Sequence, residues 1–199
     1  VRLAAGSWVY PACEPCAGTV PVFTLDTLTV AAGCGFNADG LGFCRAGPDW
    51  YLNGRGPGRG NGNPNIGPGN GTGAGHGGKG GKSFSVYGLA YGCSNAPLYA
   101  GSTGGNFGND RSGNAGGAVC IRVTGKAELA GTLTASARDS PGSGGGASGG
   151  SVFLRAGSFV AAPSAALFAD GGASGNADGG GGRIAVWSGV RPADEEAIL

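Results

Sequence analysis

Three short segments in the second half of the chain repeat one pattern, and their spacing constrains the fold more than any other feature. Residues 116–123, 149–156 and 181–188 each begin with Gly-Gly and continue with alternating aliphatic positions. The three Gly-Gly pairs are 33 and 32 residues apart. A fixed period of this size indicates a solenoid-like array, because one such repeat cannot bury its apolar face without a neighbour.

The alternation within each segment predicts β-strands. In the first segment Val119, Ile121 and Val123 point to one face, because successive side chains of a strand alternate. If the segments stack in register, the apolar rows are Val119/Val152/Ile184 and Ile121/Leu154/Val186. Each fully buried aliphatic side chain in such a row contributes roughly 1.5–3 kcal/mol to stability.

The opposite face of these strands carries a pair of arginines. Its rows are Cys120/Phe153/Ala185 and Arg122/Arg155/Trp187. Like charges directly opposed on adjacent strands repel each other. We therefore expect this face to be solvated or to meet acidic or sugar groups.

A second, shorter strand is expected in each repeat. The alternating apolar residues around Leu133 recur around Leu167, and residues 34–40 align with residues 165–171. Both of these aligned segments end in Ala-Asp-Gly, which is a turn signal because Asp and Gly tolerate the backbone angles of tight turns. The short strands and turns together predict an all-β fold.

Glycine is the dominant residue between the expected strands. The chain has 47 glycines and 11 prolines among 199 residues. The glycine-rich tracts are residues 54–81, 101–117, 142–150 and 171–182. Ordering glycine costs backbone entropy, so a folded chain keeps it where backbones approach closely or φ is positive. Closely packed extended or polyproline-II segments are one arrangement, and flexible surface loops are the other.

The cysteines indicate disulfide bonds. Six are present, an even number without a Cys/His metal pattern: Cys13, Cys16, Cys34, Cys44, Cys93 and Cys120. Such a set favours a disulfide-bonded protein of an oxidising compartment, although the pairing does not follow from the sequence. Cys13 and Cys16 form a CxxC, for which a metal site and a redox pair are the alternatives.

Composition bounds the domain organisation and the partners. We expect a cysteine-containing extension over residues 1–22, a glycine-rich β-repeat domain over residues 23–188, and a C-terminal tail over residues 189–199 that leads into a further segment. The net charge of +1 gives no electrostatic case for nucleic acid or an anionic membrane surface. No stretch reaches the roughly 18 apolar residues of a membrane span.

The context of the reactive and metal-binding side chains indicates structural roles for them rather than catalysis. His76, the only histidine, lies among glycines, so we expect its ring to pack against or hydrogen-bond glycine backbone. The aspartates sit in turn-like contexts, with calcium binding at Asp39, Asp170 or Asp178 as the alternative. We therefore expect no catalytic residue, metal or cofactor, and we interpret the chain as a protein that is not an enzyme.

Several aromatic residues surround the first glycine tract. They are Trp50, Tyr51, Tyr87, Tyr91 and Tyr99. Packing within the protein is one role for them, and a glycan-binding or subunit-contact surface shared with Arg122 and Arg155 is the other. Asn70 begins an Asn-Gly-Thr sequon and is a candidate N-glycosylation site if the protein is secreted.

The order of these motifs resembles a known family. The Gly-Ala-Gly-His-Gly-Gly run at residues 73–78, the Gly-Gly strands, and the Gly-Gly-Gly-Gly-Arg-Ile-Ala-Val end at residues 179–186 look like the glycine-rich extracellular repeat proteins of protists, algae and bacteria. The resemblance spans about residues 25–188. It implies a parallel β-helix-like domain with long glycine-rich loops and a cell-surface or matrix role.

These expectations favour a structural function outside the cell. We expect a secreted or cell-surface protein that is a subunit or segment of a filament, sheath or matrix, with copies of itself or neighbouring domains as partners. Exposed edges of stacked strands would be capped by such a partner. The alternatives are a glycan-binding adhesin module and, third, a polysaccharide-degrading enzyme.

Overall fold

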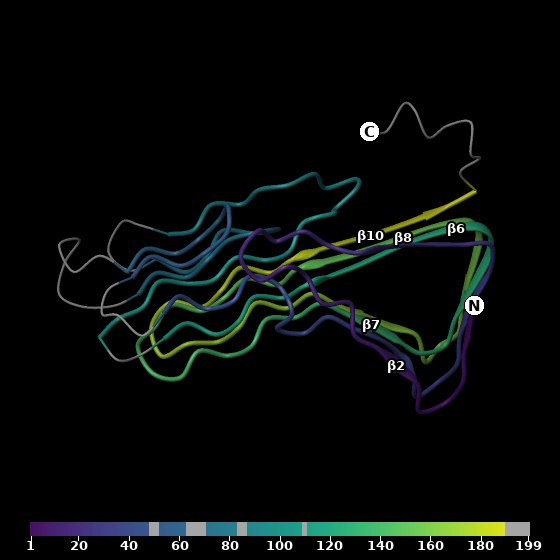
Figure 1. Ribbon diagram of the computed structural model, residues 1–199, viewed down its shortest axis with the longest axis horizontal. Coiled ribbons are helices and arrows are strands. Elements are labelled where there is room, and N and C mark those ends of the chain that lie inside the picture. Colours follow the sequence, from purple (N-terminus) through teal and green to yellow (C-terminus); the bar gives the residue numbers. More distant parts are fainter. Residues whose placement is uncertain (48–51, 63–70, 83–86, 109–110, 190–199) are drawn as a thin grey trace.

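The computed structural model places its strands at one end of the molecule and its glycine tracts at the other (Figure 1). It describes residues 1–47, 52–62, 71–82, 87–108 and 111–189. These residues contain no helix and about 29% strand. All of the strand pairs between them are parallel.

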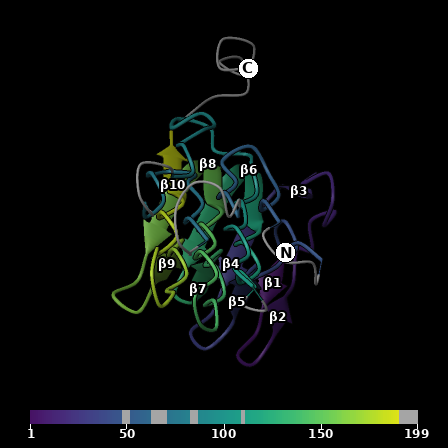
Figure 2. The same ribbon diagram turned by 90° about the vertical axis from the view of Figure 1, so that its left-hand side faces the viewer.

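The larger sheet has six strands and is built around two long ones. Its strands are β1 (Arg2–Leu3), β3 (Val22–Leu25), β4 (Leu28–Val30), β6 (Ala118–Leu129), β8 (Ser151–Ala161) and β10 (Arg183–Ser188). The order is β1-β4-β6-β8-β10, and β3 pairs with the first half of β6 while β4 pairs with its second half. Figure 2 shows these strands side by side.

The smaller sheet has four strands, each of which follows a strand of the larger sheet along the chain. They are β2 (Trp8–Val9), β5 (Gly35–Asn37), β7 (Thr132–Thr134) and β9 (Ala166–Phe168), in the order β2-β5-β7-β9. Leu133 pairs with both Phe36 and Leu167. The expected alignment of residues 34–40 with residues 165–171 is therefore confirmed.

The apolar core lies between the two sheets. Val119, Ile121, Val152 and Leu154 of the larger sheet pack with side chains of the smaller sheet such as Leu133. Val119 pairs with Val152, and Val152 pairs with Ile184, while Ile121, Leu154 and Val186 form the next row. Both apolar rows expected from the Gly-Gly spacing are thus confirmed.

The glycine tracts form an ordered array of extended segments, and most of their residues are buried. Segments 71–76, 101–106 and 144–150 are buried throughout, and none of them is a β-strand. Their backbones hydrogen-bond sideways to one another: the N–H groups of Ala74 and Gly145 donate to the carbonyls of Gly146 and Gly105 at 2.9 and 2.8 Å. Of the two arrangements open to these tracts, close packing is the one found.

Glycine is required in this array because the backbones leave no room for a side chain. A Cβ atom built on Gly145 would lie 2.0 Å from the Thr72 carbonyl oxygen, and one on Gly104 would lie 2.1 Å from that of Gly145. Collagen provides the analogous case, in which only glycine fits where extended chains meet. Small hydroxyl side chains fill the remaining positions, as where the Ser102 hydroxyl accepts a hydrogen bond from Gly58 N.

The fold class expected from the sequence is wrong. A disulfide-bonded all-β fold of the parallel β-helix or solenoid type with long glycine-rich loops is not shown. Instead, two parallel sheets adjoin an ordered glycine array, and all six cysteines are free thiols. The physical reasons are that the glycine tracts satisfy their backbone groups among themselves, and that three thiols are buried as small apolar side chains.

The first residues of the chain contribute to both sheets. Leu3 pairs with Val30 in the larger sheet, and Trp8 pairs with Gly35 in the smaller one. The first pair lies at the edge of the larger sheet opposite β10, and the second pair lies at the edge of the smaller sheet opposite β9. The segment expected as an N-terminal extension therefore includes the strands at one end of the sheets.

Candidate functional surfaces

Part of the outer face of the larger sheet is covered by other segments of the chain. Cys120 and Phe153 are buried there against Val20, Ala96 and Leu98. The expectation of a solvated face is therefore wrong for this row. The covering segments share no sequence period with the strands, so the sequence pattern does not reveal them.

The next row of the same face carries the two arginines. Arg122 pairs with Arg155, Thr24 pairs with Arg122 on one side, and Trp187 pairs with Arg155 on the other. We call Thr24, Arg122, Arg155 and Trp187 the arginine row. Both arginines are half-buried, and the Nε atom of Arg122 is enclosed without a hydrogen-bond partner. The row remains partly open to solvent, although the covering segment reaches it at Trp187.

Trp187 is held in place by the segment that covers the sheet. Its indole Nε1 donates to the Asn95 carbonyl oxygen at 2.8 Å. The side chain also packs against the buried cluster of Ala118, Cys120 and Phe153, as those of Ala96 and Leu98 do. The sequence places Trp187 in the arginine row, but it gives no signal for the role of Asn95, which lies 92 residues away.

His76 is a buried packing residue, as the sequence predicts. Its Nδ1 lies 2.8 Å from the Gly149 carbonyl oxygen, and its ring stacks on Tyr91 at a centroid distance of 4.6 Å. Burial lowers the pKa of His76, and the positive charge of Arg183 lowers it further, while the hydrogen bond to Gly149 opposes them. The imidazole Nε2 is buried without a hydrogen-bond partner.

Three tyrosines, Tyr87, Tyr91 and Tyr99, lie in the segment that runs along the glycine array. Tyr91 and Tyr99 have ring centroids 6.2 Å apart, and the Tyr91 hydroxyl donates to the Ala100 carbonyl. Burial raises the pKa of Tyr91 far above its usual range. Tyr87 contacts Lys79, whose ammonium lies 5.0 Å from the centre of its ring. The candidate residues Trp50, Tyr51 and Asn70 lie outside the described residues.

The six cysteines lie in four environments. Cys16 and Cys44 share one donor, since the Arg55 Nη1 atom lies 3.3 Å from the first sulfur and 2.9 Å from the second. Burial raises the pKa of Cys120 to about 12, and the nearby Cys13 thiol adds to the effect. The remaining two are Cys34, buried in the core, and Cys93, which is exposed.

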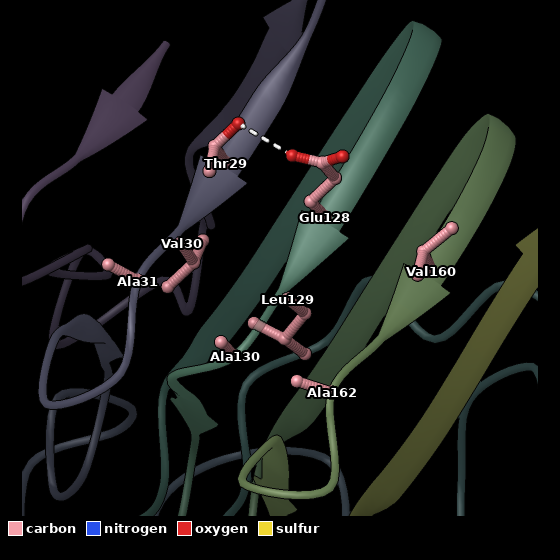
Figure 3. A pocket seen from close by; sticks show the side chains of 8 residues that line it. All are labelled: Thr29, Val30, Ala31, Glu128, Leu129, Ala130, Val160 and Ala162. Carbon is pink, nitrogen blue, oxygen red and sulfur yellow. Dashed lines mark hydrogen bonds between the residues drawn. The ribbon is translucent and has the colours of Figure 1, made fainter.

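A shallow apolar pocket lies where the two long strands turn toward the smaller sheet (Figure 3). Leu129, Val160 and Ala162 line it, and the Thr29 hydroxyl donates to Glu128 at 3.5 Å. The Lys126 ammonium forms an ion pair with Glu128 and lowers the pKa of that carboxyl. Glu128 is the only carboxylate lining this pocket, whereas glycosidic cleavage requires two that face each other.

The aspartates considered as calcium ligands instead accept hydrogen bonds from nearby turns and from neighbouring strands. Asp39 Oδ1 accepts hydrogen bonds from the Thr134 hydroxyl at 2.6 Å and from the Ser136 N–H at 2.7 Å. Asp178 accepts from the Ser174 N–H. Within the described part of the chain, no group of three or more His, Cys, Asp or Glu side chains is placed to hold a metal ion.

Both sheets end in unpaired strands among the described residues. β10 is the last strand of the larger sheet and β9 of the smaller one. Ile184 and Val186 on β10 are 45% and 36% exposed although they continue the buried core rows, and Leu167 on β9 is only half-buried beside the fully buried Leu133. The apolar core is thus open at this end of the sheets.

Comparisons with known proteins do not assign the chain to a family. No family model, curated protein or solved structure matches it. Over the described residues, no helix is long and apolar enough to cross a membrane.

Proposed function

We propose that this chain is an extracellular structural protein, a subunit or segment of a filament, sheath or matrix, that extends by pairing its sheet edges with a second copy. The observation that carries the proposal is the open core at β10. Ile184 and Val186 lie in rows that are fully buried on β6 and β8 but exposed on β10. Exposed strand edges of this kind are templates for pairing with another chain.

The opposite edge of the sheet offers a matching surface. Phe23 on β3 lies in the same row as Ile121, Leu154 and Val186, so one apolar row runs from edge to edge. A second copy stacked in register would place its Phe23 beside Val186. Parallel strand addition would supply main-chain hydrogen bonds as well as apolar burial.

The two edges differ, so the contact is of the head-to-tail type. β10 and β9 form one end, while β3, β1 and β2 form the other. Contacts between unlike surfaces generate open chains unless the rotation between copies closes a ring. A filament or layer is therefore the natural product of this pairing.

The charge on the β10 edge does not oppose this contact. Exposed edges are often protected from pairing by charged side chains. Arg183 carries the one charge within β10, and its Nε donates to the Tyr91 carbonyl oxygen at 3.1 Å. This side chain is thus turned back onto its own molecule.

The extracellular location is part of the proposal and is supported by the resemblance to glycine-rich surface proteins. The cysteines, which are free in the structure, lend it no support. An N-glycan on Asn70 of the native protein, detected by the intact mass before and after enzymatic deglycosylation, would establish passage through a secretory pathway. Native protein purified from the cytosol would refute this location.

The assembly is tested with a charge at the open edge. Ile184→Lys should leave the monomer folded, because the side chain is half exposed, and should raise the concentration needed for assembly at least tenfold, or about 1.4 kcal/mol. Leu89→Lys, at a residue that is 60% exposed and belongs to neither sheet, is the matched control and should assemble normally. Light scattering and electron microscopy give the readout, and a wild-type monomer at millimolar concentration would refute the proposal.

A further inference from the structure

Two cysteines and one arginine from three separate segments of the chain meet at one place. Cys16 belongs to a turn near the N-terminus, Cys44 to the irregular segment that follows β5, and Arg55 to the first glycine tract. We propose that Cys16 and Cys44 bind one soft monovalent metal ion, Cu(I), between their sulfur atoms. None of the three residues belongs to either sheet, so this site is independent of assembly through the sheet edges.

The Arg55 guanidinium group brings the two sulfur atoms together. Its Nη1 atom lies 3.3 Å from the Sγ atom of Cys16 and 2.9 Å from that of Cys44. The Cys44 N–H also donates to the Pro15 carbonyl oxygen at 3.2 Å, which holds the two cysteine-bearing segments side by side. Cys16 is exposed and Cys44 is half-buried, so an ion from solvent can reach both thiols.

The pair that meets is not the CxxC of the sequence. Cys13 is buried in a cluster with Phe43 and lies near the Cys120 thiol. Cys16, three residues further along the chain, is exposed instead. The structure therefore separates the two cysteines of the CxxC and gives Cys16 a partner 28 residues away in the sequence.

Hydrogen bonds to the backbone fix the residues of this site. The Glu14 carboxylate accepts a hydrogen bond from the Cys16 N–H at 2.9 Å and another from the Ala17 N–H. The Arg55 N–H donates to the Thr103 hydroxyl at 2.7 Å, and the Thr103 N–H donates to the Arg55 carbonyl oxygen at 2.9 Å. The ligands and the arginine are thus held in position before a metal ion arrives, which favours binding.

The ligand set selects the kind of metal ion. Thiolates are soft ligands that prefer Cu(I), whereas calcium and magnesium prefer oxygen ligands. Structural zinc sites take four ligands. Within the described part of the chain, no group of three or more His, Cys, Asp or Glu side chains is placed to hold a metal ion. An ion that two thiolates can hold is therefore the one that fits.

The charge of Arg55 fits the complex that would form. Binding makes two Cu–S bonds and releases both S–H protons to solvent, and no electron is transferred. The resulting group of two thiolates and one Cu(I) carries a net charge of −1, which the guanidinium group offsets. Among the described residues, no carboxylate forms an ion pair with Arg55. Its charge and its N–H donors are therefore available to the sulfur atoms, in the manner of an outer-shell partner of a metal site.

Binding is measured on the full chain by titration of Cu(I) in competition with the chromophoric chelator bicinchoninate. Ascorbate keeps the copper monovalent, and no thiol reductant is present. We expect one copper per chain, seen in native mass spectrometry as the mass of one copper less two protons. A chain that takes no copper from the chelator overturns the proposal, and so does one in which Cys16 and Cys44 are joined in a disulfide.

Cysteine variants locate the site. Cys16→Ser and Cys44→Ser should each abolish binding, and Cys16→Ser should fold normally because the side chain is exposed. Cys93→Ser removes another exposed thiol and should bind copper like the wild type. The proposal is overturned if Cys16→Ser still binds, or if Cys93→Ser loses binding as completely as Cys16→Ser does.

Arginine variants test the role of the charge. Arg55→Gln should weaken binding about tenfold, and Arg55→Lys, which keeps the charge, should recover most of this loss. Arg59→Gln removes the same charge from an exposed position nearby in the chain and should leave binding unchanged. Equal weakening by Arg55→Gln and Arg59→Gln would show that copper responds to net charge alone and would overturn the role of Arg55.

Discussion

The sheet end of the molecule is stabilised by side-chain packing, whereas the glycine end is stabilised by hydrogen bonds between backbones. Between the sheets, branched side chains such as Ile121 and Leu154 fill the core. In the glycine array, backbone groups hydrogen-bond to backbone groups, and the largest fully buried side chain among its described residues is that of His76. The sheet end should therefore tolerate exchange of one apolar side chain for another, while the glycine end should tolerate no added atom at its contacts.

The largest effect is expected from one methyl group in the glycine array. Gly145→Ala would place a Cβ atom 2.0 Å from the Thr72 carbonyl oxygen, so two backbones must separate and their hydrogen bonds must break. We expect the free energy of unfolding to fall by more than about 3 kcal/mol in denaturant titrations. Gly78→Ala is the control, because nothing lies within 4 Å of its added Cβ, and it should change stability by less than about 1 kcal/mol. Equal effects of the two substitutions would contradict close backbone packing.

The sheet core should respond to lost volume and tolerate changed shape. Leu154→Ala leaves a cavity between the sheets and should lower the free energy of unfolding by about 2–5 kcal/mol. Leu154→Met keeps the volume and should lower it by less than about 1.5 kcal/mol. If the methionine variant were as unstable as the alanine variant, the core would be as intolerant as the glycine array, and the contrast between the two ends would fail.

A smaller, pH-dependent effect is expected from His76. Its pKa is lowered in the folded protein, so below about pH 6.5 the unfolded chain binds a proton that the folded chain excludes. Stability should therefore be complete above about pH 6.5 and should fall with decreasing pH, by at most about 1.4 kcal/mol per pH unit. Unfolding titrations of wild type and His76→Gln between about pH 5 and 7 test this, because the variant lacks the histidine contribution. Identical pH dependence of the two proteins would show that His76 titrates equally in both states.

The smallest effect concerns the thiols, whose modification tests the absence of disulfides without perturbing either end. Cys16 and Cys93 are exposed, and backbone hydrogen bonds lower the pKa of Cys93, so an alkylating reagent should modify these two first. The buried Cys13, Cys34 and Cys120 should react only after unfolding. Mass spectrometry without a reductant gives the order of modification. Fewer than six alkylated cysteines in denaturant would show that disulfides form after all.

The sequence predicts the local repeat well and the long-range contacts poorly. The Gly-Gly period is sufficient to align Val119, Val152 and Ile184, because in-register parallel strands preserve that spacing. Pairing of Val22 with Cys120 joins residues far apart in the chain and carries no periodic signal. An even number of cysteines is equally compatible with disulfides and with buried thiols, and only the structure decides between them.

The candidate surfaces show the same division. The facing positions of Arg122 and Arg155 follow from strand alternation, and so does Trp187 beside them. The cover over Cys120 and Phe153 does not, because residues 96–98 belong to an irregular segment. The open edge at Ile184 is also hidden in the sequence, where it looks like any other position in the apolar row.

Hydrogen exchange of individual backbone amides tests the account most directly, because it reports on the glycine array without any substitution. The amides of Ala74, Gly105 and Gly146 donate to neighbouring glycine-tract carbonyls and should be protected as strongly as those of Ile121 and Leu154 in the sheet. Exchange of the three glycine-tract amides at the rates of an unstructured peptide, with the sheet amides still protected, would show that the tracts are loops and would contradict the account.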